Sequence, residues 1–326
     1  MILIYYFQNN TLNKAPLEIN QPIPENALWI DLINPTKEEE NFIENTLNIE
    51  IPNPEEISQI QVSSCFYCEN SAYYLTAKMS TQLIDEEITV EGITFILKDK
   101  ILITTRYFEP QSFKYISSQI NKFSPDKLKP IKILINLLES AVYYVSDVLE
   151  KVGKDINNQT SLIFRSKQKL TKISKKYDFK TLLKQIGNSG DTVAKTRESL
   201  LSINRLLNYI RSHEEISLDS NYTEHLSTLI QDIAALNDHA SFLSNKINFL
   251  LDATLGMINI EQNNIIKIFS VAAVAFLPPT LIASIYGMNF EFMPELHWKF
   301  GYPFAFGLML FSAWVPFRFF KKKGWL

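Results

Sequence analysis

The segment YGMNFEFMPEL, residues 286–296, places polar groups between two apolar segments near the end of the chain. Asn289 carries a side-chain amide, and Glu291 and Glu295 carry carboxylates. Carboxylates on a short connection raise the local concentration of cations. Either this segment is an ordinary loop, or the two apolar segments exist to hold it in place.

Cys65 and Cys68 have a spacing, CFYC, that also occurs in metal and redox sites. A zinc site needs about four ligands, and no second Cys or Cys/His pair lies in range. We therefore interpret both cysteines as strand residues in a reduced compartment. The four histidines are scattered and form no H-E-x-x-H cluster, and the phosphate-binding pattern G-x-x-x-x-G-K is absent. The sequence thus predicts no catalytic residue and no organic cofactor.

Two apolar segments flank the polar one. Residues 268–286 contain 19 positions without a formal charge, and residues 300–317 contain 18 more. Each segment is long enough to cross ~30 Å of hydrocarbon as a helix. We predict two membrane spans at the C-terminus. The alternative is a buried hydrophobic hairpin in a soluble core.

The charges that flank these segments predict their orientation. Four basic residues follow the second segment, and the connection between the segments holds two carboxylates against the single Lys299. The basic residues are Arg318, Lys321, Lys322 and Lys323. Because Lys and Arg near span ends tend to remain in the cytoplasm, both termini are predicted to be cytoplasmic. The N-terminus MILIYYFQNN lacks a basic region and a cleavage site and is predicted to be a strand, not a signal peptide.

The rest of the chain has two parts. Up to about Pro130, prolines are frequent and short β-branched or aromatic runs recur, which predicts an α+β domain. A helix is predicted after Thr36, which can cap it. Between Pro130 and Pro278 no proline occurs, and long helices are predicted, with breaks at residues 187–191 and 217–222. A continuous helix is predicted from residue 223 into the first span.

The first span carries a seam at helical spacing that is polar at both ends and apolar in the middle. Its positions include Asn263, Ile266, Phe269, Leu277 and Thr280. Several copies of the chain around an axis could enclose a conduit along this seam. The alternative is that small residues pack a single helix hairpin. Two adjacent prolines at residues 278–279 remove helical donors, which a water-filled path or a simple kink would accommodate.

The chain resembles the CorA family of magnesium transporters. The resemblance is carried by YGMNFEFMPEL, by NNIIKIFSVAAVAFLPPTLIASI before it, and by the second span and KKKGWL after it. Gly287, Met288 and Asn289 form the family's signature triplet. The resemblance implies an ion channel, not an enzyme: a homopentameric, funnel-shaped assembly with an α+β cytoplasmic domain, long helices and two C-terminal transmembrane helices.

The resemblance also implies roles for single residues. Asn289 would form a ring of amides at the outer mouth within the Gly-Met-Asn selectivity loop. Thr280, Leu277, Phe269, Ile266 and Asn263 would line successive levels of the pore. Glu291 and Glu295 would attract cations. Uncharged oxygens suit a hydrated Mg²⁺ ion, which gives up water reluctantly.

The implied organisation assigns each part of the chain a place. Residues 1–130 would form the cytoplasmic α+β domain, 131–220 a cytoplasmic helical region, 221–264 a stalk helix, 265–286 the pore-lining span, 287–299 the external loop, 300–317 the second span and 318–326 a basic cytoplasmic tail. The location would be a bacterial inner membrane. The expected partners are further copies of the chain, the bilayer and hydrated Mg²⁺, with Co²⁺ and Ni²⁺ as further ions and no nucleic acid.

Regulation by cytoplasmic Mg²⁺ is a family feature, and Asp232 and Asp238 are the candidate sensor residues on the stalk. Gly256 is either a bend point for gating or a site of close helix contact. Two other functions remain open: a zinc transporter that shares the Gly-Met-Asn loop, and a membrane-tethered sensor whose spans only anchor it.

Overall fold

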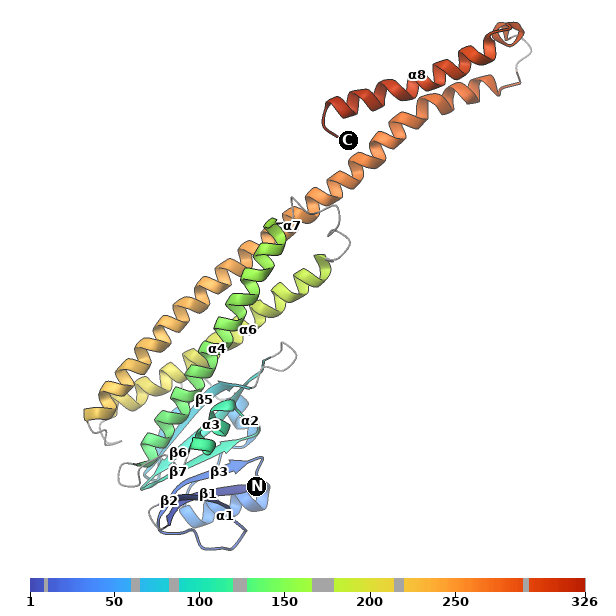
Figure 1. The fold of residues 1–326 in the computed structure, drawn as a ribbon. Helices are drawn as coiled ribbons and strands as arrows, with labels where there is room; N and C mark the ends of the chain where they lie inside the picture. The colour runs from blue at the N-terminus through green and yellow to red at the C-terminus, as the bar shows by residue number, and fades with distance from the viewer. Residues whose placement is uncertain are drawn as a thin grey trace. The chain divides into compact units, whose positions relative to one another are not determined.

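The computed structural model describes residues 1–8, 11–59, 65–81, 88–119, 128–165, 179–213, 220–289 and 293–325 of the 326-residue chain. The chain divides into two compact units, Met1–Leu251 and Asp252–Leu326. Figure 1 shows the strands gathered in the N-terminal part of the first unit, with long helices leading away from them.

A seven-stranded mixed sheet organises the first unit. The strands are β1 (Ile2–Gln8), β2 (Thr11–Pro16), β3 (Ala27–Ile33), β4 (Phe66–Glu69), β5 (Ala72–Ser80), β6 (Val90–Lys98) and β7 (Ile101–Arg106). Their order is β2-β1-β3-β7-β6-β5-β4, and only the β3–β7 pair among these is parallel. A two-residue turn with Asp99 at positive φ joins β6 to β7, as the polar sequence Lys98-Asp99-Lys100 predicts.

One face of the sheet is covered by α1 (Lys37–Leu47) and α2 (Pro54–Gln59). Ile43 of α1 is fully buried in a cluster with Ile30 and Ile103 of the sheet. A Cβ added at Gly92 would collide with Ile57 of α2, so only glycine allows this close approach. The predicted Thr36 cap is confirmed: its hydroxyl accepts a bond from the Glu39 backbone N–H, and the Glu39 carboxylate accepts one from the Thr36 N–H.

The other face is covered by α3 (Gln111–Gln119), α4 (Pro130–Arg165) and α6 (Phe179–Ser212). Phe113 of α3 lies 5.8 Å from Trp29 and 6.4 Å from Phe95, ring centre to ring centre. The backbone N–H of Lys78 in β5 donates to the Ser202 hydroxyl of α6 at 2.8 Å. The first unit is therefore a three-layer structure with its core on both faces of the sheet.

A buried ion pair joins the two parallel strands. Arg106 Nη2 of β7 lies 2.9 Å from Asp31 Oδ2 of β3, and these side chains are 4% and 1% exposed. Thr104 donates to Asp31 Oδ1 at 2.7 Å, and the guanidinium lies over the Phe113 ring at 4.7 Å. Removing one member of such a pair leaves an uncompensated buried charge, which costs about 3–5 kcal/mol.

The predicted helix break at residues 187–191 is wrong, because these residues lie inside α6. A glycine in a helix interior costs only about 1 kcal/mol. Ile186 and Val193, which flank the segment, are buried, and an added Cβ at Gly190 would contact Ile247 at 3.6 Å. Burial of this helix face outweighs the local preference for a turn.

One further helix, α7 (Ser220–Tyr286), runs from the first unit into the second. Its start agrees with a predicted break near residues 217–222, of which 217–219 lie outside the described residues. In the first unit α7 packs on α4: Lys246 Nζ donates to Asn157 Oδ1 at 2.6 Å, and the Phe164 and Phe249 rings stack at 6.0 Å.

The second unit consists of the C-terminal part of α7, the short η5 (Pro294–His297) and α8 (Gly301–Lys322). Among the described residues, α7 and α8 are the helices long and apolar enough to cross a membrane. In each of these helices, only 6% of the most apolar stretch of 18 residues is buried. A soluble core helix would be mostly buried, so the alternative of a buried hydrophobic hairpin does not fit this chain.

Candidate functional site

The helix α7 continues through its two prolines. Pro278 and Pro279 lie inside it. Because proline has no backbone N–H, the carbonyls of Val274 and Ala275 do not accept their usual helical hydrogen bonds. The Thr280 hydroxyl donates to the Phe276 carbonyl at 2.8 Å. The chain thus keeps a helical path here while leaving acceptors that water can satisfy.

The predicted pore-lining residues lie along one stripe of this helix. At about 100° per residue, Asn263, Ile266, Phe269, Leu277 and Thr280 fall within a sector of roughly 120°. All five are exposed in the single chain, with Phe269 at 70% and Leu277 at 66%. The stripe is apolar in the middle and polar at both ends. It is the type of surface that contacts other copies of a chain or a narrow aqueous path.

The signature triplet begins directly after the last residue of α7. The Gly287 N–H donates to the Ala283 carbonyl at 3.0 Å, and the Met288 N–H donates to the Ile285 carbonyl at 3.2 Å. A Cβ at Gly287 would lie 3.3 Å from the Ala283 oxygen, so glycine permits this tight final turn. Asn289 follows, and it is exposed.

The side chains of the two loop carboxylates lie outside the described part of the chain. Glu291 lies outside the described residues. Glu295 belongs to η5 by its backbone, but its side chain also lies outside the described part of the chain. Their predicted role in attracting cations therefore stays a prediction from the sequence.

The candidate sensor residues Asp232 and Asp238 both lie on the part of α7 that belongs to the first unit. Six residues apart, they point about 120° away from each other around the helix axis. Asp232 lies close enough to Tyr143 of α4 to affect its pKa. The negative charge of Glu139 is the largest cause of the raised pKa of Tyr143, and the charge of Asp232 adds a smaller contribution. The structure does not bring the two aspartates together within one chain.

No group of three or more His, Cys, Asp or Glu side chains could hold a metal ion among the described residues. Cys68 lies in the edge strand β4 and is exposed, so its interpretation as a strand residue is confirmed. Cys65 lies just before β4, so the same interpretation is wrong for Cys65. Any ion site within the described part of one chain must therefore use neutral oxygens, at most two His, Cys, Asp or Glu side chains, or groups from another copy.

The aromatic residues at the two ends of α8 were not singled out from the sequence, whereas the basic residues near its C-terminal end were. The Trp298 ring lies 5.8 Å from Phe304 at one end. At the other, Arg318 lies over the Trp314 ring at 5.3 Å and Phe320 stacks on Trp325 at 5.2 Å. Tryptophans at both ends of an apolar segment are the signal that could have found them. Such rings are enriched at membrane–water interfaces.

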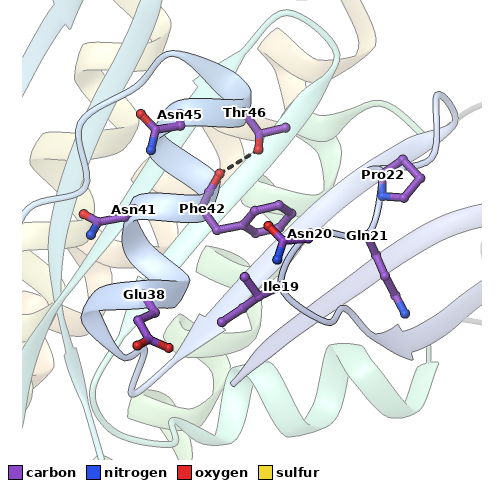
Figure 2. A pocket seen from close by; sticks show the side chains of 9 residues that line it. All are labelled: Ile19, Asn20, Gln21, Pro22, Glu38, Asn41, Phe42, Asn45 and Thr46. Atoms are coloured by element: carbon purple, nitrogen blue, oxygen red, sulfur yellow. Dashed lines mark hydrogen bonds between the residues drawn. The ribbon is translucent and has the colours of Figure 1, made fainter.

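Figure 2 shows an open groove between α1 and residues 19–22 in the first unit. Asn20, Asn41 and Asn45 are three of the six polar residues that line it, and the Phe42 ring points from α1 toward Asn20. Glu38 is the single titratable side chain among the residues that line it. The groove offers no pair of groups for acid–base chemistry.

Comparison with known proteins gives a consistent result over the full length. The family model "CorA-like Mg2+ transporter protein" matches residues 24–322. The chain is 32% identical over 324 residues to the magnesium transport protein CorA of Haemophilus influenzae, covering 99% of this chain and 100% of that protein. It is also 32% identical over 326 residues to the CorA of Escherichia coli K12, with 100% of both covered.

The solved structure of the CorA magnesium transporter from Methanocaldococcus jannaschii has the same fold. It matches with a TM-score of 0.77 at 18% identity, covering 100% of this chain and 99% of that one. At this identity the match speaks for the fold alone. Together with the relatives in sequence, it covers the soluble part and both apolar helices.

Proposed function

The chain belongs to the CorA family of Mg²⁺ transporters, and we propose that it forms a pentameric channel through which hydrated Mg²⁺ enters the cytoplasm. A CorA-type protein is an ion transporter and not an enzyme. The observation that carries the proposal is the exposed stripe on α7, which leads directly to Gly287, Met288 and Asn289.

A pore requires more than one copy. Two spans per chain cannot enclose a conduit, whereas five copies of α7 around an axis would cover the exposed stripe and surround a path along it. The more uniformly apolar α8 would then face lipid.

The outer mouth would act on the water shell of the ion. Mg²⁺ requires near-octahedral oxygen coordination and dehydrates reluctantly, so neutral oxygens that accept hydrogen bonds from its waters can admit it without stripping the shell. Five Asn289 amides and the nearby Gly287 carbonyls would supply these oxygens. A ring of carboxylates would bind the ion more tightly and slow its release.

Below the outer mouth, the pore would be polar at both ends and apolar between them. The Thr280 hydroxyl already donates its proton to the Phe276 carbonyl, so its oxygen can only accept hydrogen bonds from the waters of a hydrated cation. Leu277, Phe269 and Ile266 would form hydrophobic constrictions. Asn263 would form a second polar ring at the cytoplasmic end.

The membrane potential would supply the driving force. We propose that the protein lies in the inner membrane of a bacterium with both termini in the cytoplasm. Arg318 and Lys323, each stacked on an aromatic ring of α8, fit the cytoplasmic interface. Entry of a divalent ion gains about 4.6 kcal/mol per 100 mV, twice the single-charge value. Glu291 and Glu295 would concentrate cations outside.

The proposed division of labour follows the predicted segments: a cytoplasmic α+β domain at residues 1–130, a helical region at 131–220, a stalk at 221–264, spans at 265–286 and 300–317, an external loop at 287–299 and a basic tail at 318–326. The helix α8 continues to Lys322, so the first part of the tail would continue this helix out of the membrane into the cytoplasmic interface. Co²⁺ and Ni²⁺ form similar hydrated ions and would also be carried.

Feedback by cytoplasmic Mg²⁺ is part of the proposal. Asp232 and Asp238 point about 120° apart on α7, so each would face a different neighbour in a ring and could bind Mg²⁺ only between copies. Charge-neutralising both should then remove the protection from proteolysis that Mg²⁺ confers on the assembled protein. Unchanged protection would mean that the sensor lies elsewhere.

The test of the pore uses a bacterium without its own Mg²⁺ uptake systems. The wild-type chain should restore growth at low Mg²⁺ and show a native mass of five copies, and Asn289→Ala should abolish growth while keeping that mass. Asn289→Gln, which keeps the amide, should retain part of the uptake. A tethered sensor would not restore growth at all, and a zinc transporter would restore growth that depends on zinc.

A further inference from the structure

An open apolar groove lies between α7 and α8 in the second unit. Its volume is about 630 Å³. Every residue that lines it is apolar or aromatic: Ala275 and Phe276 of α7, and Leu310, Phe311, Ala313, Trp314 and Phe317 of α8. An empty groove would deprive its walls of van der Waals contacts, so within a bilayer an apolar group must fill it.

The α7 side of the groove faces away from the stripe that carries the predicted pore-lining residues. At about 100° per residue, Ala275 lies about 180° around the helix axis from the middle of the stripe, and Phe276 lies just outside the edge of the stripe. Copies of the chain that met along the stripe would leave the groove open to lipid. A lipid chain therefore fits the position of the groove better than a helix of another copy.

The length of the groove matches one leaflet of a bilayer. On α8 its lining extends from Leu310 to Phe317, and Arg318 follows directly. At about 1.5 Å per residue, the helix rises about 12 Å between Leu310 and Arg318. One leaflet contains half of the ~30 Å hydrocarbon layer, or about 15 Å. An acyl chain that began near Arg318 would thus lie along the groove within a single leaflet.

Two basic residues lie at the end of the groove where a lipid headgroup would be. Arg318 lies over the ring of Trp314, a lining residue, at 5.3 Å. Lys321 is exposed, and it points within about 20° of the mean direction of the α8 residues that line the groove. Among the described residues, neither of the two forms an ion pair with a carboxylate. Both charges are therefore available to an anion at this level.

These charges, and not the groove itself, would select among lipids. Lipid tails are as apolar as leucine, so the groove alone gives little preference for one lipid over another. The guanidinium of Arg318 can donate two hydrogen bonds to a phosphate, and Lys321 adds a point charge. Phosphatidylcholine carries a cation beside its phosphate, which the two basic residues would repel. A lipid with a net negative headgroup avoids this repulsion.

We propose that the groove binds one acyl chain of an anionic phospholipid in the cytoplasmic leaflet, and that Arg318 and Lys321 hold its phosphate. The lipid would brace α7 against α8 on the side away from the stripe. This inference rests on the proposed membrane location of α7 and α8. It depends neither on the pore nor on the identity of the transported ion.

Trp314 can report on the lipid that occupies the groove. Of the four tryptophans of the chain, Trp29 is fully buried in the first unit. Replacing Trp298 and Trp325 by phenylalanine leaves Trp314, which is 52% exposed, as the tryptophan that a lipid can reach. Bromine atoms on an acyl chain quench the fluorescence of a ring that they contact.

The test uses the full-length protein with these two replacements, reconstituted into phosphatidylcholine vesicles. Either brominated phosphatidylglycerol or brominated phosphatidylcholine is added, and the quenching of Trp314 gives the relative affinity of the groove for the two lipids. Each basic residue at a membrane surface contributes about fivefold, so phosphatidylglycerol should bind about 25-fold better. Arg318→Gln and Lys321→Gln should each reduce this preference about fivefold.

Lys323→Gln is the matched control. It removes the same charge from the same end of α8, but Lys323 points about 150° away from the groove and lies over the Phe319 ring at 5.0 Å. Because the attraction falls off within a Debye length, this variant should change the preference less than about twofold. Equal melting temperatures and native masses in detergent would show that the variants keep their fold and assembly.

Three results would overturn the proposal. Equal quenching by the two lipids would show that α8 lies in the bilayer but that the groove does not select an anionic headgroup. An equal loss of preference in Lys323→Gln and Arg318→Gln would show that the charges act without the groove. If neither lipid quenched Trp314, the groove would be covered by another copy of the chain.

Discussion

At the scale of single residues, an apolar side chain that is exposed on the chain is unfavourable in water. Ile266, Phe269 and Leu277 are each more than half exposed on α7, and the polar Asn263 and Thr280 lie on the same stripe. In lipid alone the two polar side chains would be unfavourable. In water alone the three apolar side chains would be unfavourable. A narrow path between copies, wet at its ends and dry in the middle, accommodates both groups.

The amide at the cytoplasmic end of the stripe gives a sharp comparison. Asn263→Ala should reduce Mg²⁺ uptake about tenfold, because losing a hydrogen-bonding ring costs about 1.4 kcal/mol in the barrier. Asn264→Ala removes the same group from the next position, about 100° around the helix, and should change uptake less than about twofold. Uptake into proteoliposomes with a Mg²⁺ dye measures both. Equal effects would contradict the assignment of the stripe.

At the scale of elements, α7 has two different environments. Leu226, Ile233 and Leu250 are fully buried against the first unit, whereas the apolar residues after Leu251 are mostly exposed. Gly256 lies just beyond this change. A Cβ added there would meet nothing within 4 Å, so a close helix contact within the chain does not explain the glycine. A bend point and a close contact with a neighbouring copy both stay hypotheses for Gly256.

Gly256→Ala should therefore stiffen α7. The substitution is expected to add about 1 kcal/mol of helix stability and to slow Mg²⁺ uptake without changing the assembly. Gly187→Ala is the matched control, because an added Cβ at Gly187 in α6 also meets nothing within 4 Å. It should raise the melting temperature similarly and leave uptake unchanged. Normal uptake by Gly256→Ala would rule out a bend at this position.

At the scale of the whole molecule, the two units require different solvents. The first unit buries its apolar side chains on both faces of the sheet, as soluble domains do. In the second unit, most residues of the two apolar helix segments are not buried, and aromatic rings lie at both ends of α8. A bilayer covers such a surface, and the family to which the chain belongs transports Mg²⁺ across one.

Transport should follow the membrane potential without ATP. In proteoliposomes with a potassium diffusion potential, an inside-negative potential should drive Mg²⁺ entry, and an inside-positive potential should suppress it. Each 100 mV is worth about 4.6 kcal/mol for a divalent ion, which is large compared with thermal energy. An internal Mg²⁺ dye reports the flux. Uptake that ignored the potential and required ATP or a proton gradient would contradict a passive channel.

Features that depend on neighbours along the chain could be predicted from the sequence. The uncharged runs identify the two apolar helices because hydrophobic length is a one-dimensional property. The Thr36 cap follows from residues three positions apart, and the β6–β7 turn follows from its polar residues. The Gly-Met-Asn triplet, read together with its flanking spans, leads to the family, which the comparisons confirm.

Features that join distant parts of the chain were decided by the tertiary structure. Residues 187–191 are helical because burial against other elements outweighs their turn preference. The Asp31–Arg106 pair joins strands that are far apart in sequence, and the Phe164 and Phe249 rings meet only where α4 packs on α7. Neither leaves a local pattern, since each depends on which side chains face each other after folding. Local energies thus determine the elements, and packing determines which of their groups meet.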